Sequence, residues 1–158
     1  MEQRYFLRRD YDSCYTTLIM LDKNLAVAIT QALKSNPNII ACYSIGSYAN
    51  QTHRPGSDFD LAVVVENKRL TDDNQIYELI RHLKFPADLD LSVVDKQSSP
   101  LFLFQVISQG KRIYMKDAFA LQSFEAFVLH NYYDTQHIRN IYNSYLGQKF
   151  APQKYANQ

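Results

Sequence analysis

Apolar and polar residues follow one another along this chain in blocks whose spacing predicts a series of helices and strands. In some blocks the apolar residues recur every three or four positions, as on the buried face of an amphipathic helix. In others they form short continuous runs, as in the buried strands of a sheet that helices cover. We expect helices at Leu21–Leu33, Thr71–Leu83 and Pro100–Gln109, and strands at Ile39–Ile45, Phe59–Val65, Ala87–Val94 and, at a sheet edge, Arg112–Met115.

Local signals mark several ends of these elements. Thr71 is expected to cap the start of its helix, and Gly110 to close the helix that begins at Pro100. From Ala118 onward aromatic and aliphatic residues keep a period near 3.6, which predicts one long helix or two in sequence. The order of elements indicates an α+β or α/β fold with a small sheet.

Length and composition indicate a single domain. A chain of 158 residues can build one core, and its 46% apolar and 21% charged residues are ordinary for a soluble protein. We expect an N-terminal tail or extension at residues 1–18 and a core at residues 19–116. A C-terminal helical segment of the same domain is expected at residues 117–150, and a frayed tail at residues 151–158.

Charge and cysteine content limit the kinds of partner that the protein can bind and indicate its cellular compartment. The net charge of +1 argues against a long nucleic-acid partner, because phosphate neutralisation usually requires a clear basic excess. No apolar run approaches the ~20 residues that span a bilayer, and the charged first ten residues do not resemble a signal peptide. Cys14 and Cys42 are too few for a disulfide framework. We therefore expect a cytoplasmic protein without a membrane partner.

Acidic residues stand at the starts of two predicted strands and indicate a metal site. Asp58 and Asp60 lie two apart, so on a strand they project to one face, with Cα atoms about 6.5 Å apart. Two carboxylates ~4 Å apart repel by about 4 kcal/mol at an effective dielectric of ~20, unless a cation lies between them. Mg²⁺ prefers such oxygen ligands, completed by water and phosphates. Asp88 or Asp90 can supply a third carboxylate, as two-ion phosphoryl transfer requires.

A Gly-Ser turn after the first predicted strand supplies a candidate phosphate site. Gly46 lets backbone amides approach an anion closely, and the Ser47 hydroxyl can donate to a phosphate oxygen. Each feature alone has an ordinary interpretation: a turn, a helix cap or an exposed strand edge. Three such features in one order, each at a strand end, together predict transfer of a phosphorus-containing group.

These residues resemble the signature of a known family. Gly46-Ser47, ten further residues and then Asp58-Phe59-Asp60 resemble the GSx10DxD motif of the polymerase β nucleotidyltransferase superfamily, and within it the minimal nucleotidyltransferases. The similarity covers roughly Ile39 to Leu146. In detail it resembles the antitoxins of HEPT/MNT toxin–antitoxin pairs, which adenylylate a tyrosine of a HEPT-family toxin.

The resemblance implies a fold, a reaction and a set of site residues. The fold would be a small mixed sheet of about four strands flanked by helices, with a long C-terminal helical segment. The reaction would move AMP from ATP to a tyrosine of a HEPT-family toxin, with Mg²⁺, and two ions are expected. Asp90 would also take the proton of the acceptor hydroxyl, and Asp88 is the less favoured candidate for that position. The implied residues are Gly46, Ser47 and Ser57 for ATP, and the catalytic Asp58, Asp60 and Asp90 for the metal.

One departure and two alternatives stay open at this point. Asn50-Gln51 stands where many relatives have a basic residue and Gly, and Arg54 from the following loop is a candidate replacement for that charge. Because only about 40 residues follow the predicted sheet, we expect a partner protein to supply the acceptor, in a hetero-oligomer. The alternatives are an enzyme that modifies a small molecule such as an antibiotic, and a non-catalytic, partner-binding antitoxin.

Overall fold

The computed structural model describes residues 23–150, in which six helices and four strands follow one another along the chain. This mixture of helices and strands confirms the expected fold class. The strands are β1 (Ile39–Ser44), β2 (Phe59–Val65), β3 (Leu89–Val94) and β4 (Lys111–Met115). The helices are α2 (Lys23–Leu33), α3 (Gly46–Asn50), α4 (Asp73–Ile80), α5 (Pro100–Gln109), α6 (Ala118–Asp134) and α7 (Gln136–Phe150).

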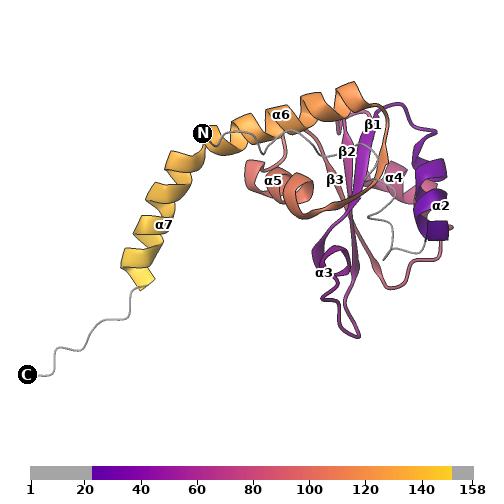
Figure 1. Ribbon diagram of the computed structural model, residues 1–158, viewed down its shortest axis with the longest axis horizontal. Coiled ribbons are helices and arrows are strands. Elements are labelled where there is room, and N and C mark those ends of the chain that lie inside the picture. The colour runs from indigo at the N-terminus through magenta and orange to yellow at the C-terminus, as the bar shows by residue number, and fades with distance from the viewer. Residues whose placement is uncertain (1–22, 151–158) are drawn as a thin grey trace, which may run out of the picture.

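The four strands form one mixed sheet in the order β3-β2-β1-β4 (Figure 1). β2 and β3 run parallel, whereas β1 is antiparallel to both β2 and β4. β4 is therefore an edge strand, as the sequence predicts. β1 and β2 are central, and every residue of β1 is buried, which explains its continuous apolar run.

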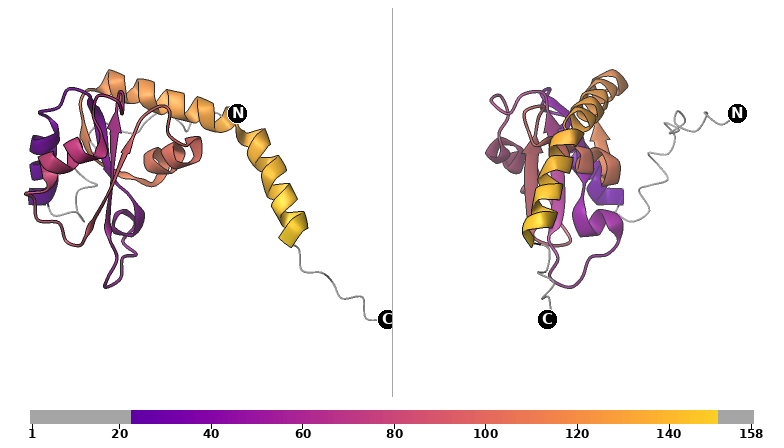
Figure 2. Two further views of the ribbon diagram at one scale, coloured as in Figure 1. Left: turned by 180° about the vertical axis from the view of Figure 1, so that it is seen from behind. Right: turned by 90° about the vertical axis from the view of Figure 1, so that its left-hand side faces the viewer.

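Helices cover both faces of the sheet. Figures 1 and 2 show α2 and α4 on one face, and α5 and α6 on the other. The α2/α4 side holds one apolar cluster, which includes Ile29, Leu33, Phe59, Leu61 and Ile76. The α5/α6 side holds a second, which includes Tyr43, Ala62, Val64, Leu103 and Phe124. Alternate residues of each strand point into the two clusters. The face that a polar residue occupies therefore follows from the cluster to which the apolar residues two positions away belong.

The helix cap expected at Thr71 is wrong. The helix begins at Asp73, and the side chain of Asp72 accepts a hydrogen bond from the backbone N–H of Gln75 at 2.8 Å. The Gln75 side chain in turn accepts from the N–H of Asp72 at 3.2 Å, which completes a capping box. Thr71 is buried, and its hydroxyl accepts from the side-chain amide of Asn36. The pattern Asp-x-x-Gln was thus the better signal, because only it satisfies two amides reciprocally.

We expect Asp72→Ala to lower the free energy of unfolding by about 1 kcal/mol, the usual cost of losing a helix N-cap. Urea denaturation followed by circular dichroism measures this loss. Glu78→Ala is the matched control, because Glu78 is on the same helix and makes only an exposed ion pair with Arg81. Such pairs contribute little, so the control is expected to change stability by less than about 0.5 kcal/mol. Equal losses in the two variants would contradict the capping role.

The C-terminal segment forms two helices rather than one. α6 packs against α5, and Thr135 separates it from α7 (Figure 1). The expected tails at residues 1–18 and 151–158, and Cys14, lie outside the described residues. Cys42 is buried, and burial raises the pKa of its thiol well above the ordinary value. Within residues 23–150, no helix has both the length and the apolar character that crossing a bilayer requires.

Candidate active site

The turn after β1 depends on glycine at position 46. Gly46 begins α3 with φ of +66°, a left-handed conformation that side chains disfavour. A Cβ atom at this position would also overlap the carboxylate of Asp60. The backbone N–H of Ile45 donates to the carbonyl of Asp60 at 3.0 Å and holds the turn against β2. Gly46 therefore permits both the turn and the close approach of a carboxylate to it.

The short helix α3 follows this turn and ends in an unusual conformation. Its first amides, which include that of Ser47, have no acceptor inside the helix, as at every helix start. Its last cap residue, Gln51, has φ of +62°, a left-handed conformation usually taken by glycine. Gln51 therefore takes a strained backbone conformation that glycine adopts at little cost.

Asp60 and Asp90 lie side by side on neighbouring strands. They are Cα partners in the parallel register of β2 and β3, so their side chains project to one face of the sheet. That face is the one that α5 and α6 cover, since Ala62 and Val64, of the same parity on β2, pack there. Asp60 is partly buried and Asp90 is exposed. The end of this face is thus acidic where the Gly-Ser turn meets it.

Three carboxylates influence one another at this end of the sheet. Burial of its carboxyl, and then the negative charges of Asp90 and Asp58, raise the pKa of Asp60. A hydrogen bond from its own backbone acts in the opposite direction. The mutual repulsion has a chemical consequence: a cation bound among these groups would relieve it.

The arrangement fits a magnesium ion that keeps other ligands. Among residues 23–150, no group of three or more His, Cys, Asp or Glu side chains is placed so that it could by itself hold a metal ion. Mg²⁺ does not need one, because it usually binds one or two carboxylates and completes its octahedron with water and substrate phosphates. That requirement is met by the carboxylate oxygens of Asp58 and Asp60 together with the adjoining Gly46-Ser47 turn, which can bind a phosphate. The predicted metal roles of Asp58, Asp60 and Asp90 stay predictions.

Asp88 occupies a different place from Asp90. β3 begins at Leu89, one residue after Asp88, and not at Ala87 as expected. The backbone carbonyl of Asp88 accepts a hydrogen bond from the N–H of Phe59 at 2.7 Å. Asp88 is exposed and lines a neighbouring pocket. The charges that raise the pKa of Asp60 belong to Asp90 and Asp58. The geometry therefore favours Asp90 as the third carboxylate.

A pocket of about 630 Å³ adjoins Asp58. It is lined by residues 53–58 of the loop after α3, by residues 86–88 before β3, and by Tyr48 of α3. The exposed Arg54 is among these residues, so a positively charged residue and Asp58 line the same pocket. The pocket is within the size range of small-molecule sites, so it can hold part of a reactant.

Ser57 shapes the loop that forms this pocket. Its hydroxyl accepts a hydrogen bond from the N–H of Arg54 at 2.9 Å, and its own N–H donates to the Arg54 carbonyl at 2.9 Å. These two bonds close a tight turn directly before Asp58. The predicted contact of Ser57 with ATP is untested, but the residue already has a structural role.

The pocket also contains an aromatic pair that the sequence pattern does not reveal. The ring of Tyr48 stacks on that of His53, with centroids 4.3 Å apart and planes 6° from parallel. Tyr48 also meets Phe59 edge-on at 5.4 Å, which ties the pair to the core. The sequence shows only two aromatic residues five positions apart, on either side of the turn at Gln51. Their contact depends on the left-handed turn that lies between them.

A mixed four-stranded sheet with a Gly-Ser turn and aspartates on β2 and β3 is the arrangement of a polymerase β-type nucleotidyltransferase. Residues 28–119 match the family described as Polymerase beta, Nucleotidyltransferase, and the chain belongs to that family. The protein adenylyltransferase MntA of Shewanella oneidensis is 33% identical over 88 residues, which are 54% of this chain and 62% of that protein. The chain thus spans less than two thirds of this curated relative.

Solved structures agree with this relationship. A crystal structure of a toxin–antitoxin with AMP-PNP has a chain that is 26% identical, with a TM-score of 0.59. The match covers 80% of this chain and 98% of that one. A tri-AMPylated Shewanella oneidensis HEPN toxin in complex with its MNT antitoxin matches with a TM-score of 0.57 at 23% identity, over 81% of this chain and 98% of the other. The second likeness supports the fold.

Proposed function

We propose that this chain is the antitoxin of a HEPT/MNT pair and transfers AMP from ATP to a tyrosine hydroxyl of its partner toxin. The observation that carries the proposal is the meeting of Gly46, Asp60 and Asp90 at one end of the sheet. Support comes from two relatives, one a protein adenylyltransferase and the other crystallised with AMP-PNP. A substrate of this kind also agrees with a cytoplasmic location.

The proposed reaction is an in-line displacement at the α-phosphorus of ATP. The acceptor oxygen forms a bond to that phosphorus, the bond to the β-phosphate oxygen breaks, and pyrophosphate leaves. The proton of the acceptor hydroxyl passes to the carboxylate of Asp90. Asp90 suits this role because it is exposed at the strand end beside Asp60 and can meet an incoming side chain.

The remaining site residues bind and orient the nucleotide. Amides at the start of α3 and the Ser47 hydroxyl donate to the triphosphate, which Gly46 allows to come close to the sheet. Bound Mg²⁺, as one ion or two, would offset the negative charge of the phosphates at Asp58 and Asp60. Arg54 supplies the positive charge that the motif lacks at Asn50, from the wall of the pocket next to Asp58.

Incubation with ATP labelled at the α-phosphorus tests the proposal. With Mg²⁺ and a HEPT-family toxin as the acceptor, label is expected on a tyrosine of the toxin. Label on an aminoglycoside instead would favour the small-molecule alternative. Absence of transfer to either acceptor, together with absence of metal binding, would favour a non-catalytic antitoxin.

Variants at the two candidate third carboxylates separate their roles. Asp90→Asn is expected to lower kcat at least about a hundredfold, the usual contribution of a positioned general base. Asp88→Asn removes a carboxylate charge two positions earlier in the chain and is expected to lower kcat less than about fivefold. Single-turnover transfer of labelled AMP measures both. The reverse order of effects would reassign the third carboxylate to Asp88.

A further inference from the structure

Helix α7 extends from the body of the protein as an arm. It leaves the end of α6 and runs outside the core, on the side of the sheet that α5 and α6 cover (Figures 1 and 2). None of its described side chains is buried, although its sequence has helical apolar spacing. Helices of this length rarely persist in water without a packed face. The arm therefore lacks the surface that would cover it.

The junction between α6 and α7 is held by specific contacts. The Arg139 guanidinium donates to the Tyr132 carbonyl and to the Thr135 hydroxyl, both at 2.6 Å. It also lies over the ring of Tyr132 at 3.9 Å, and that ring stacks on Phe104 of α5 at 3.8 Å. One arginine thus satisfies a carbonyl at the end of α6 and joins α7 to the helix layer. The direction of the arm is set by this anchor.

One face of α7 is apolar and exposed. Ile138, Ile141, Tyr142 and Tyr145, here called the α7 stripe, occupy positions i, i+3, i+4 and i+7. Each of these side chains is more than half exposed, between 55% and 69%. Lys149 continues the same face one turn further, with its ammonium 5.8 Å from the ring of Tyr145. A large exposed apolar face of this kind usually marks a contact with another protein.

The charges of α7 indicate what that protein presents. Residues 136–150 contain Arg139 and Lys149 but no Asp or Glu. Two copies of the helix would bring positive charges together with no carboxylate to pair them, which disfavours self-association through this face. An apolar groove with acidic side chains at its rim would complement both the α7 stripe and Lys149.

We propose that the α7 stripe docks the protein that carries the acceptor hydroxyl, in an apolar groove with an acidic rim. This inference rests on the proposed function, because that partner is the toxin to be modified. The arm extends from the same side of the sheet to which Asp60 and Asp90 project. A partner held by α7 is thus placed on the catalytic side. The toxin would be selected by the arm, while the aspartates act on its tyrosine.

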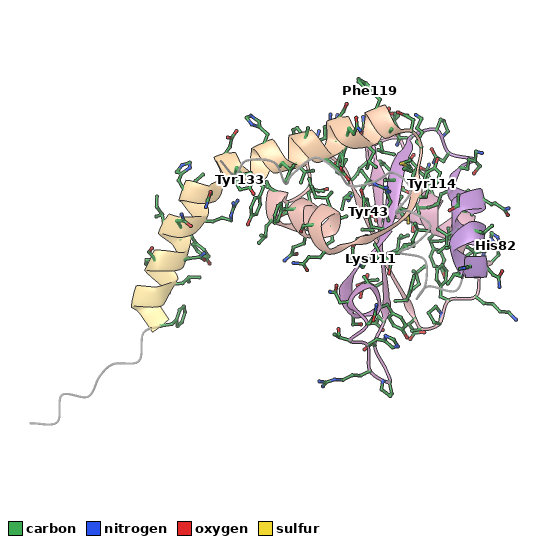
Figure 3. All side chains as sticks on the ribbon, viewed as in Figure 1. Tyr43, His82, Lys111, Tyr114, Phe119 and Tyr133 are labelled. Atoms are coloured by element: carbon green, nitrogen blue, oxygen red, sulfur yellow. The ribbon has the colours of Figure 1, made fainter. Side chains whose placement is uncertain are left out.

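Binding of a HEPT-family toxin tests the docking surface. Ile141→Ser with Tyr145→Ser is expected to raise the Kd at least about tenfold, as when exposed anchors of an interface are lost. Lys149→Glu is expected to raise the Kd about threefold or more and to weaken its dependence on salt. Phe119→Ser is the matched control: it removes an 81% exposed apolar side chain at the far end of α6, and the Kd is expected not to change (Figure 3). Because all these side chains are exposed, the variants are expected to melt with the wild type.

Two further measurements separate the docking inference from the proposed function. A short peptide with the acceptor tyrosine cannot reach α7, so the variants should modify it at the wild-type rate. If the wild type binds the toxin but transfers no AMP, the proposed AMP transfer is contradicted. The binding data then still decide whether α7 is the docking surface. Wild-type affinity in the double variant would overturn the docking surface. A wild-type dimer that this variant dissociates would assign the stripe to self-association and would overturn it too.

Discussion

Asp60→Asn will lower AMP transfer by about a thousandfold and leave the protein folded. Asp60 is the carboxylate that lies against the Gly46 turn and next to Asp90, so it is central to the proposed site. The charge stabilisation lost with a metal ligand is several kcal/mol, and each 1.36 kcal/mol is a factor of ten in rate. Transfer of labelled AMP under single-turnover conditions measures the loss. Replacement of Asp58 and Asp60 together is expected to abolish transfer.

The same variant is expected to be slightly more stable than the wild type near neutral pH. Burial and the charges of Asp90 and Asp58 raise the folded pKa of Asp60, so the folded protein prefers the protonated carboxyl. The stability from this proton is complete below the unfolded pKa of about 3.9 and is lost as the pH rises through the folded pKa. Asn removes the cost of the ionised group. The gain in melting temperature should therefore shrink as the pH falls toward about 4.

Asp73→Asn is the matched control for these effects. Asp73 lies on α4, and its side chain accepts a hydrogen bond from the N–H of Val93, away from the catalytic end. Its replacement is expected to leave transfer within about threefold of the wild type, because no reacting group is removed. If Asp60→Asn retained full transfer while Asp73→Asn did not, the aspartates would have no catalytic part.

Gly46→Ala will remove AMP transfer and destabilise the fold by at least about 1–2 kcal/mol. Two costs add at this position: the left-handed φ of +66°, worth about 1–2 kcal/mol, and the overlap of the new Cβ with the Asp60 carboxylate. Relief of that overlap must displace either the turn or the carboxylate. Both belong to the proposed site, so activity is lost even in molecules that still fold. Denaturant unfolding and AMP transfer measure the two effects.

Gly56→Ala isolates the backbone cost from the steric one. Gly56 has a φ of +89°, but a Cβ there would meet no atom within 4 Å. Its replacement is expected to cost only the backbone strain, about 1–2 kcal/mol. The excess loss in Gly46→Ala then measures the collision with Asp60. Equal losses of stability in the two variants would mean that the Asp60 carboxylate moves away from the new Cβ at little cost, and the loss of AMP transfer would then report the collision.

The sequence determined those features that depend on neighbouring residues. β2 at Phe59–Val65 and α5 at Pro100–Gln109 lie where they were predicted. A continuous apolar run marks β2, and a proline at the start and a glycine after the end mark α5, so both signals depend only on nearby residues. The GSx10DxD spacing likewise indicates the family, because it depends only on the order of residues along the chain. The wrong cap at Thr71 is instructive, since the correct signal at Asp72 and Gln75 was equally local. Thr71 and Asp72 were both possible caps, and Asp72 forms the cap because it and Gln75 exchange hydrogen bonds.

The tertiary structure alone decided which distant residues meet. The sequence favours Asp90 over Asp88 only by the family resemblance, and the register of β2 with β3 places Asp90 next to Asp60. The contact of Tyr48 with His53 depends in the same way on the left-handed Gln51. A helical period predicted α7, yet it cannot tell a covered face from an exposed one. Strand register and helix packing join residues far apart in the chain, so they follow from the whole fold and not from local pattern.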